Sequence, residues 1–205
     1  DFTVRVGFQN SVNLVFVRLM RDIVRYEVHQ IEPNVDQWLA EPSSPKRREY
    51  LARFIDQESG TFMRRFYLQY QGKTVNQALD LMFAGKRVSP VALAVALRSV
   101  NPSMGESQFA EEMRQRLAGP ALSNDALHSL YVKYGIDKFS LRDRGYLAHV
   151  HPLALWVVER LRRQPDISLK QVLQDSATVR QDVYEWLTRA RISPGQTNRI
   201  RQQLE

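Results

Sequence analysis

Pairs of serine and proline constrain this fold more than any other feature, because each pair marks the start of a helix. Ser44-Pro45, Ser89-Pro90 and Ser193-Pro194 each place a capping hydroxyl before a proline whose fixed φ suits the first helical position. Apolar residues at helical spacing follow the first two pairs. The chain is therefore predicted to contain short helices with defined starts.

Other segments show the same signals. Thr74, Ser123 and Ser140 precede apolar residues at helical spacing, and Gly85 and Gly135 follow two of these runs. The run after Ser89 is apolar on nearly all sides, which predicts a core helix. We expect an all-α fold, an irregular multi-helix bundle of about ten helices. Besides the helices after Ser44 and Ser89, they are expected over residues 74–85, 107–119, 123–135, 140–150, 151–163, 168–176 and 177–191.

The N-terminal segment differs from the rest of the chain. Phe2, Val4 and Val6 alternate with polar residues or glycine, which allows one short strand there. Prolines predict a looser joint at residues 31–47, and residues 101–105 are predicted to form a second one. We predict a transpeptidase-like arm over residues 1–30 and a helical domain over residues 31–205.

The chain is basic, with 29 Lys and Arg against 22 Asp and Glu. Such an excess favours association with polyanions, although a solvated surface without a special partner is the simpler interpretation. Tyr50, Phe66, Tyr67 and Tyr70 interleave with two of the basic clusters at a spacing that favours core packing. The candidate anion-binding residues are Lys46, Arg47, Arg48, Arg64, Arg65, Arg160, Arg162 and Arg163.

The sequence gives little support for cysteine-based sites, a phosphate-binding loop or a histidine metal site. The absence of cysteine excludes disulfides and thiolate metal sites. Gly72-Lys73-Thr74 matches the end of a phosphate-binding loop, but Tyr67 stands where that motif needs glycine, so we predict a helix end followed by a threonine cap. His149 and His151 are predicted to lie at a helix junction and not to bind a metal. No cofactor is expected.

The apolar stretch near the N-terminus is predicted to be a mostly buried helix that begins near Asn10 or Ser11. It is too short to span a membrane, and Arg18, Arg21 and Asp22 interrupt it. We therefore expect the chain itself to be soluble, and we interpret it as part of a longer protein.

This stretch carries a resemblance to a known family. NSVNLVFVRLMRDI resembles the Ser-x-Asn segment that precedes a helix in penicillin-binding transpeptidases. In that family the serine relays protons to the nucleophile and the asparagine positions the substrate. The resemblance assigns these roles to Ser11 and Asn13.

The other elements of that chemistry do not match. The family needs a Ser-x-x-Lys nucleophile before the Ser-x-Asn and a Lys-Thr-Gly on a strand. Ser43-Ser44-Pro45-Lys46 follows the Ser-x-Asn and lies in a proline-broken loop, and Lys73-Thr74-Val75 lacks the glycine and is predicted to be helical. We expect that the chain cannot acylate on its own and that Ser11 and Asn13 are vestigial.

A second resemblance covers the later part of the chain. SLRDRGYLAHVHPLALWVVERLRR, followed by VRQDVYEWLTRAR, is similar to the C-terminal helical region of large class A penicillin-binding-like proteins of Gram-negative bacteria. These are membrane-anchored peptidoglycan glycosyltransferases with a transpeptidase-like part. The resemblance implies cell-wall synthesis at the periplasmic face of the inner membrane, with any anchor outside this chain.

Two functions follow as expectations. The first is a non-catalytic accessory domain of a peptidoglycan synthase, which positions other domains of the parent chain or binds a protein partner. The alternative is a basic helical adaptor that recruits acidic protein segments or another polyanion, as secretion-system adaptors do, in a setting that includes the cytoplasm. Nucleic-acid binding ranks last, because no motif supports it.

Overall fold

The computed structural model describes residues 26, 30, 34–117 and 122–189, apart from the side chains of residues 186–189. The chain divides into two compact units, Asp1–Leu51 with Leu187–Glu205, and Ala52–Trp186. The predicted boundary between residues 30 and 31 borders on residues outside the described part, so it stays a prediction.

Every regular element within the described residues is a helix, which confirms the all-α prediction. The predicted N-terminal strand and the apolar helix after Asn10 lie outside these residues. The elements are α3 (Val35–Ala40), α4 (Pro45–Tyr70), α5 (Val75–Phe83), α6 (Pro90–Val100), α7 (Glu106–Arg116), α8 (Asn124–Lys133), the 3-10 helix η1 (Ile136–Lys138), α9 (Leu141–Ala148), α10 (Pro152–Arg163), α11 (Leu169–Asp175) and α12 (Ala177–Arg189).

Side-chain caps begin the helices at the predicted residues. The hydroxyls of Ser89, Ser123 and Ser140 each accept a hydrogen bond of 3.1–3.2 Å from the backbone N–H three residues further on. Thr74 and Gln77 cap reciprocally: the Thr74 hydroxyl accepts from the Gln77 N–H at 3.2 Å, and the Gln77 side-chain oxygen accepts from the Thr74 N–H at 3.0 Å. These bonds satisfy N–H groups that have no partner inside a helix.

Both Ser-Pro pairs in the described ranges begin a helix. Helix α4 begins at Pro45 and α6 begins at Pro90, as predicted. The Ser44 hydroxyl accepts from the Arg47 N–H at 3.4 Å, a longer bond than those of the other serine caps. The third pair, Ser193-Pro194, lies outside the described residues.

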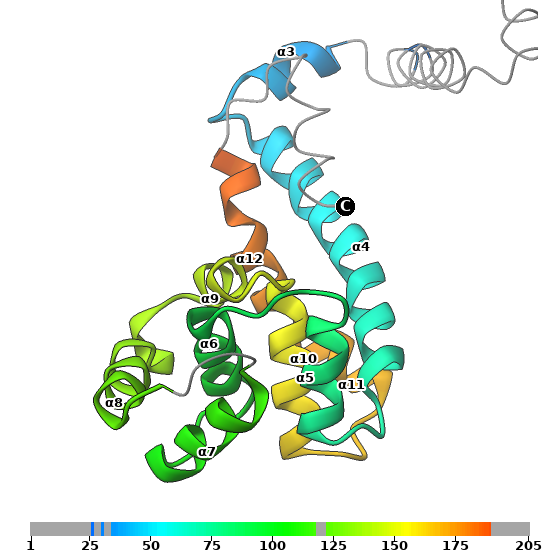
Figure 1. Cartoon of the computed structure of the whole chain (residues 1–205). Helices are drawn as coiled ribbons and strands as arrows, with labels where there is room; N and C mark the ends of the chain where they lie inside the picture. The colour runs from blue at the N-terminus through cyan, green and yellow to red at the C-terminus, as the bar shows by residue number, and fades with distance from the viewer. Residues whose placement is uncertain (1–25, 27–29, 31–33, 118–121, 190–205) are drawn as a thin grey trace, which may run out of the picture. The chain divides into compact units, whose positions relative to one another are not determined.

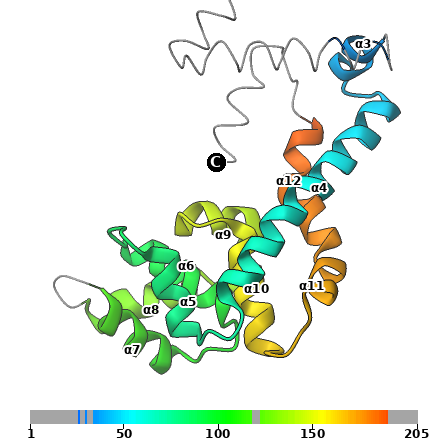
Figure 2. The same ribbon diagram turned by 90° about the vertical axis from the view of Figure 1, so that its right-hand side faces the viewer.

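Helix α6 lies at the centre of the second unit. It contacts α7, α8, α9 and α10, which cross it in different directions (Figures 1 and 2). Leu93, Val95 and Leu97 are at most 1% exposed, which confirms the predicted core helix. Each such side chain stabilises the fold by about 1.5–3 kcal/mol when it leaves water.

Helices α9 and α10 approach closely at Gly145. A Cβ atom there would lie 2.8 Å from Cδ and 2.9 Å from Cα of Pro152, well inside the usual contact distance of two carbons. Between the helices the chain turns at His149, whose φ of 54° is left-handed. Because Gly145 has no side chain, α10 can begin against the surface of α9.

Polar side chains add specific links between helices around this core. Arg180 of α12 is only 5% exposed and pairs with Asp56 of α4. Arg180 also donates to the Leu173 carbonyl oxygen at 2.8 Å and to the Ser176 hydroxyl at 2.7 Å. A buried guanidinium is costly without such partners, so these bonds fix where this part of α12 lies.

The first predicted joint contains a short helix, contrary to the prediction from the sequence. Residues 31–47 were expected to be loose because of their prolines, yet α3 forms over Val35–Ala40. The Asn34 carbonyl oxygen accepts from the N–H groups of Gln37 and Trp38 at 3.1 and 3.2 Å, and Val35 is buried. Six residues between prolines are enough for this single short helix.

The central role of α6 gives a stability prediction. Leu97→Ala is expected to lower the free energy of unfolding by about 3 kcal/mol, because Leu97 is fully buried and its truncation leaves a cavity in the core. Leu68→Ala is the matched control, since Leu68 is 70% exposed on α4, and it should change the same quantity by less than about 0.5 kcal/mol. Urea unfolding followed by circular dichroism measures both; equal effects would contradict the assignment of the core.

Candidate functional site

The structure leaves the predicted catalytic residues without a test. Ser11 and Asn13 lie outside the described residues. In the Ser-x-x-Lys match, Ser43 and Ser44 lie before α4, whereas Pro45 and Lys46 form its first turn. The predicted proline-broken loop is therefore confirmed only for the two serines, because Pro45 suits the first helical position. The Ser43 hydroxyl donates to the Glu41 carboxylate at 2.6 Å and is thus engaged locally.

The Gly72-Lys73-Thr74 segment is a turn between two helices. Gly72 has a φ of 70°, which reverses the chain after α4, and Thr74 caps α5. This arrangement confirms the predicted helix end followed by a threonine cap. The prediction that Lys73-Thr74-Val75 is helical is wrong for Lys73 and Thr74, which lie in the turn, because the capping bond starts α5 only at Val75. Lys73 in this turn also borders a groove.

The two neighbouring histidines lie at a helix junction, as predicted. His149 ends α9 and His151 caps α10 by accepting from the Leu153 N–H at Nδ1, over 3.2 Å. No group of residues suited to a metal ion occurs in the part of the chain that the structure describes.

His151 has an unusual environment for a titratable group. The centroid of its ring lies 5.0 Å from the ring centroids of Phe62 and of Phe66. Its Nε2 donates a hydrogen bond to the Tyr184 hydroxyl at 2.9 Å. Burial lowers the pKa of His151 to about 4 and raises the pKa of Tyr184 to about 12. Both side chains are therefore neutral at pH 7, which suits their position among aromatic rings.

The basic cluster on α10 contributes to internal structure. Arg160 pairs with Asp175 of α11, and the Nε of Arg162 donates to the Val100 carbonyl oxygen at 3.0 Å. Glu159 lies 3.9 Å from Nη2 of Arg162 and 3.7 Å from Nη1 of Arg163. Of these three arginines, Arg162 is the one that also borders a groove.

The other two basic clusters lie on α4. Arg64 and Arg65 are exposed and form no ion pair with any described residue. In the first unit, Lys46 and Arg48 are exposed, whereas Arg47 is fully buried. The anion-binding role of these residues stays a prediction.

The aromatic residues between the basic clusters follow the predicted core spacing with one exception. Phe66, Tyr67 and Tyr70 are buried. Tyr50 is about half exposed and instead meets Trp38 edge to face, with ring centroids 5.8 Å apart. Core packing therefore holds for the three residues near the end of α4.

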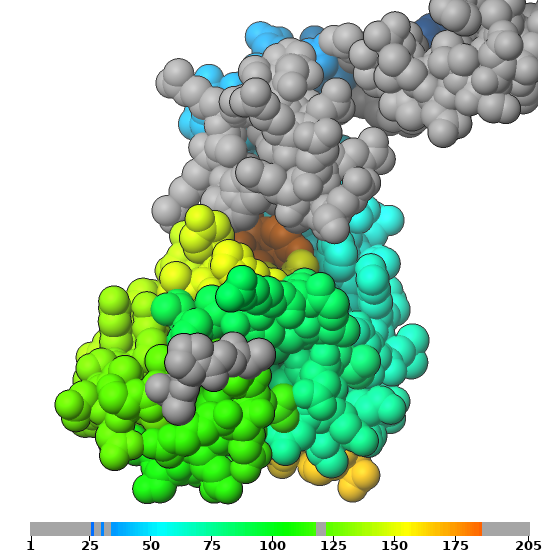
Figure 3. Space-filling model, viewed as in Figure 1, coloured from blue at the N-terminus to red at the C-terminus, as the bar shows by residue number. Residues whose placement is uncertain are grey.

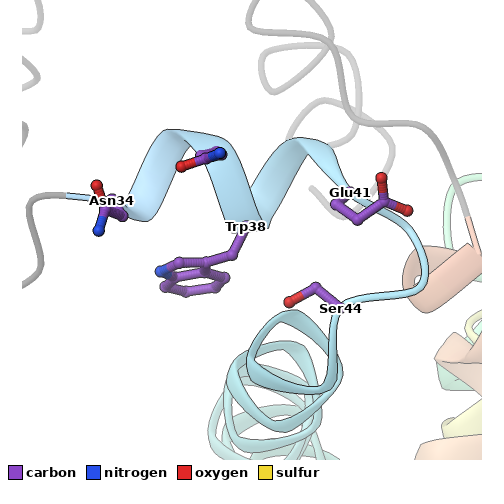
Figure 4. A pocket seen from close by; sticks show the side chains of 5 residues that line it. Asn34, Trp38, Glu41 and Ser44 are labelled. Carbon is purple, nitrogen blue, oxygen red and sulfur yellow. The ribbon is translucent and has the colours of Figure 1, made fainter.

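A hollow of about 360 Å³ lies beside α3 in the first unit. Figure 4 shows the Trp38 indole on the side of α3 that faces the start of α4, with Asn34, Glu41 and Ser44 around the hollow. Its lining is about equally polar and apolar and includes a carboxylate but no cation. It does not complement an anionic ligand.

A groove of about 330 Å³ lies between α5 and α10 in the second unit, and we call it the α5 groove. Residues of α5 border those of the C-terminal half of α4 in the space-filling view (Figure 3). The turn between these helices, the start of α5 and the second half of α10 contribute to its lining. The residues that determine its chemistry are Tyr70, Lys73, Val75, Val158, Leu161 and Arg162.

The α5 groove combines an apolar floor with positive charge. Val158 and Leu161 are almost fully buried, and Lys73 and Arg162 bring two cations to the lining. The first turn of α5 also lies at the groove, and a helix N-terminus carries partial positive charge. The groove can therefore accept an anionic group that is attached to an apolar one.

Tyr70 adds a hydrogen-bond donor to this lining. The residue is only 4% exposed, but its hydroxyl oxygen still reaches solvent, since it is not one of the buried side-chain oxygens that lack a hydrogen bond. Burial raises the pKa of the phenol, while the charge of Arg65 opposes that shift, so the hydroxyl keeps its proton at pH 7.

Sequence reasoning identified parts of this groove but not the groove itself. Arg162 belonged to a candidate cluster, Lys73 to a rejected phosphate loop and Tyr70 to a set of core aromatics. Nothing in their spacing indicates that α10 returns to the end of α4. The capped turn at residues 71–74 was the available signal, because it places a helix N-terminus near a lysine.

Comparison with known proteins gives no relative of this chain. No family model matches it, and neither the curated proteins nor the solved structures include a significant match. Among the described helices, none combines the length and apolar character needed to cross a bilayer.

The position of His151 gives a pH prediction. The unfolded chain binds a proton at this residue below about pH 6.5, whereas the folded protein resists protonation down to about pH 4. Its contribution to stability is therefore complete above pH 6.5 and is lost as the pH falls toward 4, by at most about 3 kcal/mol.

The variant His151→Asn retains a side-chain acceptor for the helix cap but does not titrate in this range. Urea unfolding at several pH values should show a smaller loss of stability between pH 6.5 and pH 4 for this variant than for the natural protein. Parallel stability curves for the two proteins would contradict the buried, neutral state of His151.

Proposed function

We propose that the chain is a non-catalytic helical accessory module of a cell-wall synthase, where it binds a protein partner or positions the catalytic parts. The α5 groove is the observation that carries the partner-binding role, because its apolar floor and cationic lining suit an acidic protein segment. The proposed setting is the periplasmic face of the inner membrane, with any anchor outside this chain.

The link to cell-wall synthesis rests on the two resemblances in the sequence. The second resemblance covers residues 140–163 and 179–191, and within the described residues these segments contribute α9, α10 and most of α12. Helix α10 forms one wall of the α5 groove. The segment that suggests the synthase family therefore also supplies part of the candidate site.

Deletion of residues 52–186 from the natural gene tests this proposal, because these residues form one of the two compact units. We expect less incorporation of labelled N-acetylglucosamine into the cell wall, at an unchanged level of the truncated protein. A strain with Val132→Ala, an exposed change outside the groove lining, is the control. Normal incorporation after the deletion would contradict the role in cell-wall synthesis.

Covalent labelling with penicillin tests whether the chain is non-catalytic. Fluorescent penicillin incubated with the purified chain should leave its intact mass unchanged. A covalent adduct on any serine would show that the chain is catalytically complete.

The second candidate function is a basic adaptor for polyanions. Exposed Arg48, Arg64 and Arg65, which form no ion pair with described residues, favour it. The engagement of Arg160 with Asp175 and of Arg162 with Val100 reduces the basic surface that this adaptor would present.

The salt dependence of polyanion binding tests the adaptor hypothesis. If exposed arginines carry the function, the affinity for poly-L-glutamate should fall at least tenfold from about 50 to 200 mM salt, because bound counterions must be displaced. Fluorescence anisotropy with labelled poly-L-glutamate measures this change. An affinity that stays constant over this range would rule out the adaptor.

A further inference from the structure

We propose that one exposed face of α4 docks on the surface of an anionic lipid bilayer. We call this face the α4 patch, and it consists of exposed residues of the second unit: Phe54, Thr61, Arg64, Arg65 and Leu68. The inference adds a membrane contact made by this chain itself to any anchor outside it. It rests on the proposed setting at the inner membrane.

The residues of the α4 patch share one side of the helix. Phe54 and Leu68 lie seven positions before and after Thr61. Arg64 and Arg65 follow Thr61 by three and four positions. Residues with these spacings form a single stripe along a helix, so one flat partner can meet all of them.

The opposite side of α4 packs into the second unit. Met63, Phe66, Tyr67 and Tyr70 are buried there, at most 9% exposed. Helix α4 lies at the right of the second unit in Figure 1 and passes in front of α10 in Figure 2, so its outward side is at the surface. The α4 patch therefore faces away from the core.

Positive charge dominates the C-terminal part of the α4 patch. Arg64 and Arg65 form no ion pair with any described residue. Residues 59–79 contain no Asp or Glu, and Lys73 in the turn after α4 is a third cation in this stretch. Glu58 is exposed at the N-terminal edge of the stretch and opposes this charge only in part. The charge complements an anionic bilayer surface, to which each basic side chain nearby is attracted.

Two exposed apolar side chains distinguish a bilayer from other polyanions. Leu68 is 70% exposed and Phe54 is 41% exposed, although both residue types are usually buried. They lie about four helical turns apart, with the arginines between them. A bilayer surface offers phosphate groups to the cations and an acyl boundary to the apolar side chains at the same time. An acidic protein segment or a sulfated polymer offers mainly the charge, so the patch favours a bilayer.

A contact through the α4 patch is expected to be weak on its own, because it is small compared with a stable membrane anchor. An anchor elsewhere in a parent chain would hold the patch at a high local concentration near the bilayer. Under that condition a weak contact is enough to orient the second unit. The patch shares no residue with the lining of the α5 groove, so both surfaces can act in the same protein.

Vesicle binding by the complete purified chain tests the inference. One set of vesicles contains equal parts of phosphatidylglycerol and phosphatidylcholine, and the other contains phosphatidylcholine alone. We expect the chain to sediment with the first set at low salt and not with the second, because only the first carries net negative charge. No sedimentation with either set, or equal sedimentation with both, would overturn the inference.

A matched pair of charge variants locates the contact. The double variant Arg64→Gln with Arg65→Gln should bind the anionic vesicles about tenfold more weakly, or worse, at an unchanged urea midpoint. The double variant Arg142→Gln with Arg163→Gln removes the same charge from exposed positions outside the patch, so it should lose much less. Equal losses would mean that net charge, and not this face, attracts the vesicles, and the inference would fail.

A fluorescent label at Leu68 tests the apolar part of the contact. The chain contains no cysteine, so Leu68→Cys gives one defined site for an environment-sensitive fluorophore. Its emission should shift to the blue with anionic vesicles and not with poly-L-glutamate, because only a bilayer surrounds the label with apolar groups. The control is Val132→Cys, at a position 54% exposed on α8, which should show no shift with either partner. A label at Leu68 that stays unshifted on bound vesicles would show a polyanion site and overturn the membrane contact.

Vesicle binding and cell-wall synthesis are measured independently. If the vesicles bind as expected but deletion of residues 52–186 leaves cell-wall synthesis normal, the cell-wall role fails while the membrane contact stands. If the deletion lowers synthesis but the chain ignores anionic vesicles, the membrane contact fails while the cell-wall role stands.

Discussion

Burial of α6 is the interaction on which the rest of the second unit depends. Its side chains are apolar on nearly every face, so it can be stable only if other helices cover it on several sides. Helices α7 to α10 supply that cover. The irregular crossing of these helices follows from the need to surround one short helix.

Polar groups around this core act mainly as links between helices. The Arg180–Asp56 and Arg160–Asp175 pairs and the Tyr67 hydrogen bond each join residues that are distant in the sequence. Such contacts contribute specificity, because a buried charge without its partner is costly.

The groove arises from the same packing that builds the core. Gly72 allows the chain to reverse after α4, and Thr74 starts α5 at once, so a helix N-terminus lies beside the end of α4. Helix α10 contributes Val158 and Leu161 to the apolar floor and Arg162 to the lining. A site for an acidic protein segment would thus need no element beyond those that the fold already requires.

The sequence by itself determined the helical class, most helix starts and the buried character of α6, because caps and apolar periodicity are local properties of the chain. It also predicted the helix junction at His149 and His151. Only the tertiary structure decided which basic residues serve as internal links and which border a groove, since that depends on helices far apart in sequence. Arg160 and Arg162 are close neighbours on α10, yet one pairs with Asp175 and the other lines the groove. No local pattern could separate them, because their difference lies entirely in what the fold places opposite each side chain.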